Sequence, residues 1–147
     1  MGGVYKGGLM KPPASPWYHG GMRSIRVPTP KEGFVNITRQ VEEVLEGHTG
    51  LVYLFVPHTT CALTVQEGAD PEVAHDLLMR LAELAPMAHP RDRHLEGNSH
   101  AHLKTLLTGV SLLLLAEGGR FRLGRWQQVF LAEFDGPRTR EVWVRPL

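Results

Sequence analysis

Histidine is the residue type that gathers most visibly in this chain. His94, His100 and His102 lie within nine positions, beside Gly97 and just ahead of a predicted short helix. Imidazole nitrogens are common metal ligands, and the free N–H groups at a helix start can bind an anion. The segment therefore predicts a metal site or an anion site, although solvated loop histidines would give the same pattern.

A further histidine, His58, follows a predicted buried strand in Pro57-His58-Thr59-Thr60. A side chain at such a strand end can be held rigidly in a cleft, and it can also simply cap a turn. His100 and His102 are two positions apart, so on a helix they point in different directions. We therefore predict that His58, His94 and His102 form the ligand set for a divalent metal, zinc or magnesium. Their spacing is not that of a zinc finger.

Two carboxylates, Glu67 and Asp70, lie three positions apart across a bend that contains glycine. Asp70 has a structural explanation, because an aspartate followed by proline is typical of a helix start. Glu67 has no such local explanation and is the stronger candidate for chemistry. Trp126 suits either core packing or an aromatic wall for a ring, with packing favoured.

Two charged positions complete the candidates. Lys104 could meet a phosphate, although exposed helical lysines are common. Glu133 and Arg138 flank the last predicted turn, where an ion pair would be ordinary.

Periodicity and turn residues predict the elements that position these side chains. Strands are predicted near 22–27, 51–56, 61–65, 110–116, 120–123, 126–134 and 139–144, the last four as two hairpins. Helices are predicted around 38–46, 71–85 and 99–107. The order of elements indicates an α+β fold, a mainly antiparallel sheet sandwich with two to three helices. A doubly wound parallel sheet is disfavoured, because the final strands lack crossover helices.

The amino-acid composition argues against some classes of function. The 147 residues include 16 basic and 15 acidic side chains, so we expect no nucleic-acid partner. No apolar run approaches the roughly 20 residues of a membrane span. The single cysteine, Cys61, lies in an apolar run and suggests a buried, reduced thiol, which fits a cytoplasmic protein. Residues 1–21, rich in Gly and Pro, are predicted to be a flexible extension, and residues 22–147 one domain.

Several motifs in register now suggest a family. They are 58–65 (HTTCALTV), Glu67 with 69–71 (ADP), 96–98 (EGN) with His102, Gly109, 119–120 (GR), 123–124 (LG), 126–127 (WQ) and 133–138 (EFDGPR). In this order they resemble the secondary thiamine-phosphate synthase family, the YjbQ-type proteins, from about residue 22 to 147. Gly68 stands where that family often has Asn, and His100 where it often has an acidic residue.

This resemblance implies a homotrimer with a histidine-bearing cleft that holds a divalent metal. It also implies an activity, in which a hydroxymethylpyrimidine diphosphate is joined to a thiazole phosphate with release of pyrophosphate, and this activity would be a secondary one. The catalytic residues would be His58, Glu67, Asp70, Asn98 and Lys104. The substrate-binding residues would be Thr59, Thr60, Gly97, Ser99, Trp126 and Arg138. Two alternatives stay open: a metal-dependent hydrolase of a phosphorylated metabolite, and a non-catalytic ligand-binding trimer.

Overall fold

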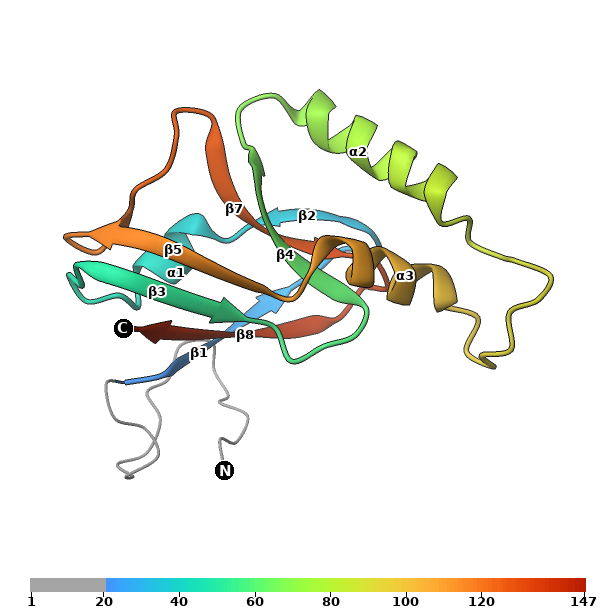
Figure 1. The fold of residues 1–147 in the computed structure, drawn as a ribbon, viewed down its shortest axis with the longest axis horizontal. Helices are drawn as coiled ribbons and strands as arrows, with labels where there is room; N and C mark the ends of the chain where they lie inside the picture. The colour runs from blue at the N-terminus through green and yellow to red at the C-terminus, as the bar shows by residue number, and fades with distance from the viewer. Residues whose placement is uncertain (1–20) are drawn as a thin grey trace.

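A computed structural model describes residues 21–147, so the predicted extension lies outside the described residues except for Gly21. The predicted α+β fold is confirmed: antiparallel sheets are combined with three helices (Figure 1). The elements are β1 (Arg23–Pro28), β2 (Gly33–Asn36), α1 (Thr38–Glu42), β3 (Gly50–Phe55), β4 (Cys61–Glu67), α2 (Pro71–Leu84), α3 (Ser99–Thr108), β5 (Ser111–Glu117), β6 (Arg120–Phe121), β7 (Gln127–Glu133) and β8 (Thr139–Pro146).

Two sheets enclose the main core. The larger has the order β1-β8-β3-β5-β6, and the smaller has the order β2-β7-β4. Side chains alternate between the two faces of a strand, so each strand of the smaller sheet contributes to two different layers. On β4 and β7, Cys61, Leu63, Val129 and Leu131 are buried in the core shared with the larger sheet and α1.

The opposite face of the smaller sheet carries α2 and α3. Ala62 and Ala132 pack there with Ala101 of α3 and with Phe134, and α2 adds Leu78 and Leu81. Three small alanines allow α3 to approach the sheet closely. The resulting order of layers is larger sheet, smaller sheet, and then α2 with α3.

The predicted hairpin of residues 126–134 and 139–144 is wrong. β7 and β8 follow one another along the chain but belong to different sheets, so residues 134–138 form a corner between the layers. The corner packs against the segment before β2: the N–H of Gly136 donates to the carbonyl of Lys31 at 2.9 Å. A Cβ on Gly136 would lie 1.9 Å from the carbonyl oxygen of Pro30, so only glycine fits there. A Gly-Pro turn signal alone does not distinguish such a corner from a hairpin.

Two smaller differences from the predicted elements concern β2 and α1. β2 was not predicted from the sequence, and α1 ends after five residues instead of continuing to Gly47. The N–H of Thr38, the first residue of this helix, donates to Oδ1 of Asn36 at 3.1 Å. Gly47 has φ +76°, a left-handed conformation that glycine adopts readily.

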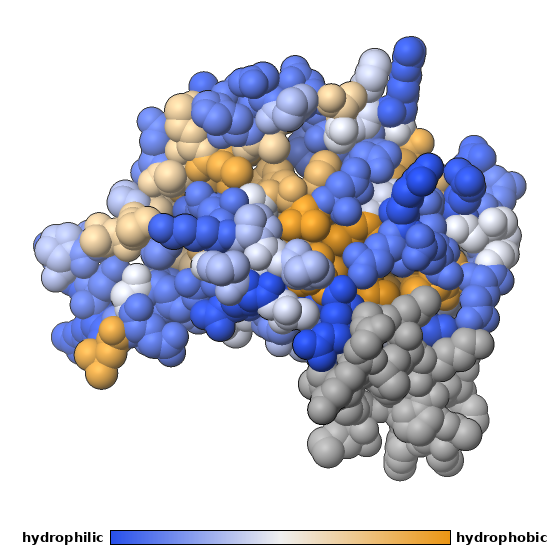
Figure 2. Space-filling model, turned by 180° about the vertical axis from the view of Figure 1, so that it is seen from behind, coloured by the Kyte–Doolittle hydropathy of each residue, from blue (hydrophilic) through white to orange (hydrophobic). Residues whose placement is uncertain are grey.

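The surface is mixed in character. Figure 2 shows the rear face, where polar side chains surround apolar ones gathered near its middle. No helix within residues 21–147 has both the length and the apolar character that crossing a membrane requires.

Candidate functional site

Three segments that are distant in sequence meet at one pocket of about 340 Å³. They are the loop after β3, the loop leading into α3, and the corner between β7 and β8. We call it the histidine pocket; it is lined by Pro57, His58, Thr59, Thr60, His94, Glu96, Asn98, His102, Asp135, Arg138 and Arg140. The structure thus brings the three histidines of the predicted metal set around one space, together with four of the other predicted site residues: Thr59, Thr60, Asn98 and Arg138.

His58 is held by the neighbouring strand. The backbone N–H of Glu141 donates to its Nε2 at 2.9 Å, so this nitrogen acts as an acceptor and the hydrogen of the neutral ring resides on Nδ1. Burial, and next the positive charge of Arg140, lower the pKa of His58 below its ordinary value. His58 is therefore a neutral imidazole at neutral pH, with a fixed tautomer.

A buried ion pair forms the floor beneath His58. Glu133 has no exposed surface, and its carboxylate accepts from Nε of Arg140 at 2.7 Å and from Nη2 at 2.5 Å. The hydroxyl of Thr29 and the N–H of Asp135 also donate to it. Burial alone would raise the pKa of Glu133, but the hydrogen bonds from Arg140, Thr29 and Asp135 outweigh it and lower the pKa.

This pair links the floor to the pocket wall, because Nη2 of Arg140 also donates to the hydroxyl of Thr60 at 2.8 Å. Arg140 was not among the residues predicted for the site, and the predicted ion pair of Glu133 with Arg138 is wrong, because Glu133 pairs with Arg140 and Arg138 with Asp135. A usable signal existed: Glu133 follows the inward positions of Val129 and Leu131 at period two, so a buried charge in need of a partner was implied.

Asp135 connects the corner to the loop before α3. Its Oδ2 accepts from Nδ2 of Asn98 at 2.8 Å and from Nη2 of Arg138 at 3.0 Å. Burial would raise the pKa of Asp135, but the hydrogen bonds from Asn98 and Arg138 dominate and lower it. Asn98 is only 7% exposed, and within residues 21–147 its Oδ1 has no hydrogen-bond partner. Oδ1 of Asn98 is therefore an acceptor without a donor at the edge of the pocket, within the described residues.

The remaining two histidines pack edge to face. The ring centroids of His94 and His102 are 5.4 Å apart with the rings edge to face, and Nε2 of His94 lies 3.8 Å from a carboxylate oxygen of Glu96. Among residues 21–147, no three His, Cys, Asp or Glu side chains are arranged to hold a metal ion. With Nε2 of His58 occupied by Glu141, the donors in this arrangement do not close around a metal, and the metal role of the three histidines stays a prediction.

Other predicted residues lie away from the pocket. Glu67, Asp70 and Trp126 are at the far end of the smaller sheet, where β4 ends and β7 begins (Figure 1). At about 3.3 Å per residue, the seven residues of β4 separate the two ends by roughly 20 Å.

Local contacts account for these three side chains. Oε2 of Glu67 accepts from the N–H groups of Ala69 and Asp70, and Asp70 caps α2 by accepting from the N–H of Glu72 at 3.0 Å. Trp126 is 54% exposed, with the guanidinium of Arg125 over its ring. It is thus neither packed in the core nor part of the pocket wall.

Gly97, Ser99 and Lys104 face other hollows. Gly97 and Lys104 line a neighbouring pocket beneath α2, and Ser99 lines a third hollow beside Leu103. Lys104 is not the exposed helical lysine that was the commoner expectation, since only 3% of it is exposed. These positions border the histidine pocket without lining it.

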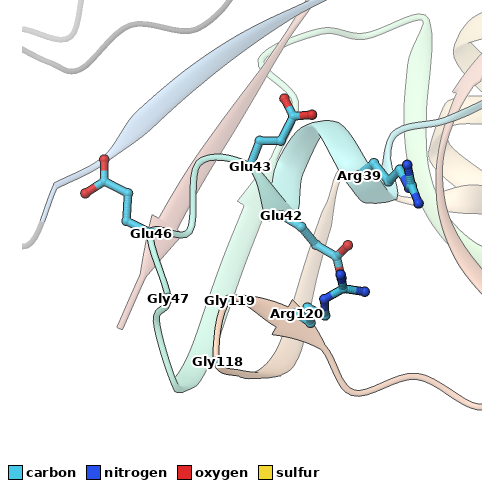
Figure 3. Close-up of a pocket in the computed structure, with 8 residues that line it drawn as sticks. All are labelled: Arg39, Glu42, Glu43, Glu46, Gly47, Gly118, Gly119 and Arg120. Atoms are coloured by element: carbon cyan, nitrogen blue, oxygen red, sulfur yellow. The ribbon is translucent and has the colours of Figure 1, made fainter.

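A hollow of about 440 Å³ lies at the opposite end of the larger sheet (Figure 3). It mixes two arginines, Arg39 and Arg120, with three glutamates from α1 and the turn after it. Glu42 accepts from the N–H of Phe121 at 2.8 Å, while Glu43 and Glu46 project away from Arg120. No residue that the sequence predicted for the site lines this hollow.

Comparison with known proteins decides the family. The model of the family described as UPF0047 protein YjbQ-like matches residues 23–147. The chain belongs to the YjbQ-like family. A curated YjbQ-like relative, protein YugU of Bacillus subtilis, is 41% identical over 128 residues, which cover 84% of this chain and 97% of YugU.

Solved YjbQ-like structures agree with the fold. The conserved hypothetical protein TT1486 from Thermus thermophilus is 82% identical with a TM-score of 0.84, covering 84% of this chain and 98% of that one. A protein of the family from Clostridium acetobutylicum is 38% identical with a TM-score of 0.80 and the same coverage. The resemblance found in the motifs is confirmed at the level of the YjbQ-like family.

Proposed function

We propose that this YjbQ-like protein is a transferase for small phosphorylated metabolites, with a thiamine-phosphate synthase type of reaction at the histidine pocket. The observation that carries the proposal is that His58, His94 and His102, from two distant segments, line one pocket with the hydroxyls of Thr59 and Thr60. Such a set of donors suits phosphate oxygens.

In the proposed reaction, the bond between the pyrimidine methylene carbon and the diphosphate oxygen breaks, and its electron pair leaves with pyrophosphate. The lone pair of the thiazole nitrogen forms the new carbon–nitrogen bond. Negative charge thus develops on the leaving group, and donors aimed at it would lower the barrier. Nδ1–H of His58, the hydroxyl of Thr59 and the guanidinium of Arg138 are the groups that we assign to this task.

The charge of the pocket supports a role for its histidines. Among the lining residues, the charges of Arg138 and Arg140 are balanced by those of Glu96 and Asp135, so the wall has no formal net charge when the imidazoles are neutral. Binding of a diphosphate then depends on directed hydrogen bonds from the lining side chains or on an added divalent cation. We keep zinc or magnesium as part of the proposal and assign no reaction step to it.

We further propose that the active form is a homotrimer. The supporting observation is that Glu67, Asp70 and Trp126 lie roughly 20 Å from the histidine pocket along β4, so only another subunit could bring them to it. Large apolar side chains on β3 and β5, among them Leu51, Tyr53, Leu113 and Leu115, are exposed and would be covered by such an assembly. Mixing an inactive His58→Ala subunit with an inactive Glu67→Ala subunit should restore part of the activity.

The activity is tested by pyrophosphate release from the two thiamine precursors, with and without added metal. His58→Ala and His102→Ala should each lower turnover by about 10²-fold or more, the usual range for removing a positioned acid, base or oxyanion donor. His75→Ala is the matched control, because His75 is an exposed histidine on α2 outside the pocket. Unchanged turnover in both folded pocket variants would overturn the proposal, and chelator-sensitive hydrolysis of phosphoesters would favour the hydrolase alternative.

A further inference from the structure

A second pocket lies beneath the end of α2, beside the histidine pocket. Its volume is about 620 Å³, and it shares only Asp135 with the histidine pocket. We call it the Lys104 pocket. Its walls come from α2 and the residue after it (Ala82, Ala85), the start of α3 (His100, Lys104), the segment before β2 (Lys31, Glu32) and Phe134.

The polar side of this pocket is unusual because it contains a buried ammonium group. Only 3% of Lys104 is exposed, and its Nζ lies 2.8 Å from Oε2 of Glu32 and 5.8 Å from the centre of the Phe134 ring. An ammonium group has three N–H donors, and the hydrogen bond to Glu32 uses one of them. Burying a charge is costly unless it is paired and hydrogen-bonded, so further acceptors at this position would stabilise it.

His100 supplies a second polar atom on the same side. It precedes Lys104 by four positions, so the two side chains lie on one face of α3. Within the part of the chain that the structure describes, Nδ1 of His100 is shielded from solvent and has no hydrogen-bond partner. In the tautomer with its hydrogen on Nδ1, His100 and Lys104 are two donors that need acceptors, one helical turn apart.

The other side of the pocket is apolar. Phe134 is almost fully buried, and Ala82, Ala85 and Met87 add aliphatic surface. A ligand that satisfies both sides has an apolar body and an acceptor group at one end.

The net charge of the Lys104 pocket indicates how much negative charge the acceptor group of the ligand carries. Asp135 is already bound to Arg138, which leaves Lys31 and Lys104 against Glu32, a formal surplus of one positive charge. A carboxylate carries one negative charge, whereas a phosphate monoester carries close to two at neutral pH. The single surplus charge and the apolar wall both favour the carboxylate.

We propose that the Lys104 pocket binds a small apolar monocarboxylate, whose carboxylate meets Nζ of Lys104 and Nδ1 of His100 and whose body packs against Phe134 and Met87. This site is separate from the proposed transferase site. It does not depend on that activity.

Benzoate is the probe, and calorimetry or ligand-detected NMR on the full chain is the measurement. So small a ligand binds weakly even in a well-formed pocket, and we expect saturable binding with a Kd of about 10 mM or lower. Benzamide, which lacks the charge, and acetate, which lacks the ring, should bind about 10-fold more weakly or worse. Inorganic phosphate should not compete. Equal binding of benzoate and benzamide, or no saturable binding of benzoate to folded protein, would overturn the proposal.

Variants locate the binding. Lys104→Met should weaken benzoate about 10-fold or more, and Ala82→Phe should block the pocket while leaving Lys104 and Glu32 in place. Glu83→Phe adds the same ring to α2 at a position that does not line the pocket and should bind benzoate normally. His102→Ala should also bind normally. Loss of benzoate binding in His102→Ala, or normal binding in Ala82→Phe, would place the ligand elsewhere and refute the assignment.

Discussion

The backbone N–H of Glu141 donates to Nε2 of His58 across 2.9 Å, so the first residue of the predicted site is fixed by a strand that lies 83 positions further along the chain. Burial, and next the positive charge of Arg140, lower the pKa of the His58 ring below its ordinary value. The pH dependence of stability should therefore report on His58.

The first prediction concerns this dependence. Because the folded pKa of His58 lies below its unfolded value of about 6.5, the unfolded state binds more protons between the two values, and the free energy of unfolding rises with pH in that window. His58→Gln removes the titrating imidazole. The amide oxygen of Gln can still accept from the N–H of Glu141, so the hydrogen bond is kept. The free energy of unfolding is measured by urea unfolding from pH 5 to 7.5. Its slope against pH should be steeper for wild type than for the variant, by at most about 1.4 kcal/mol per pH unit. Parallel curves would contradict the assigned pKa direction.

The second prediction concerns the buried pair of Glu133 and Arg140. Arg140→Met leaves a fully buried carboxylate without its cation and should lower the free energy of unfolding by about 3–5 kcal/mol. Adding Glu133→Gln removes the stranded charge while keeping an acceptor for Thr29. The double variant should therefore be more stable than Arg140→Met alone, as measured by denaturant unfolding. Strict additivity of the two single changes would show that the pair is not coupled.

The third prediction concerns the thiol of Cys61, the single cysteine of the chain. Burial raises the pKa of this thiol to about 12. At pH 8 only about one thiol in 10⁴ would be ionised, and the thiolate is the reactive form. Labelling with a thiol reagent should be slow in native protein and fast in urea. Rapid stoichiometric labelling of the native protein would contradict the burial of Cys61.

The fourth prediction concerns the contact of Asn98 with Asp135. Asn98→Ala removes a hydrogen bond to a charged group and should cost about 1.5–3 kcal/mol of stability. Asn98→Asp has the same size but places a second carboxylate beside Asp135, so at neutral pH it should destabilise more than alanine does. The stability of Asn98→Asp relative to Asn98→Ala should rise on acidification, when one of the two carboxyl groups is protonated. A pH-independent difference between the two variants would argue against direct repulsion.

Local sequence patterns predicted much of the secondary structure. The start of α2 at Asp70 and Pro71 and the buried Cys61 each follow from the conformational or solvation preference of one residue type and its neighbours. Such preferences act over a few residues. The strand of residues 33–36 was missed because it is short and gains its stability by pairing with β7, about 100 positions away.

Sequence alone also determined the family and the α+β class, because these depend on residue type and order along the chain. It pointed to two of the segments that line the pocket, the loop after β3 and the loop leading into α3. Which residues meet in space follows from the packing of the sheets and helices. This packing paired Glu133 with Arg140 instead of Arg138, separated Glu67 and Trp126 from the histidines, and buried Lys104 against Glu32 and Phe134. The physical reason is that a charge buried by long-range packing must find its partner in space, and spacing along the chain does not specify that partner.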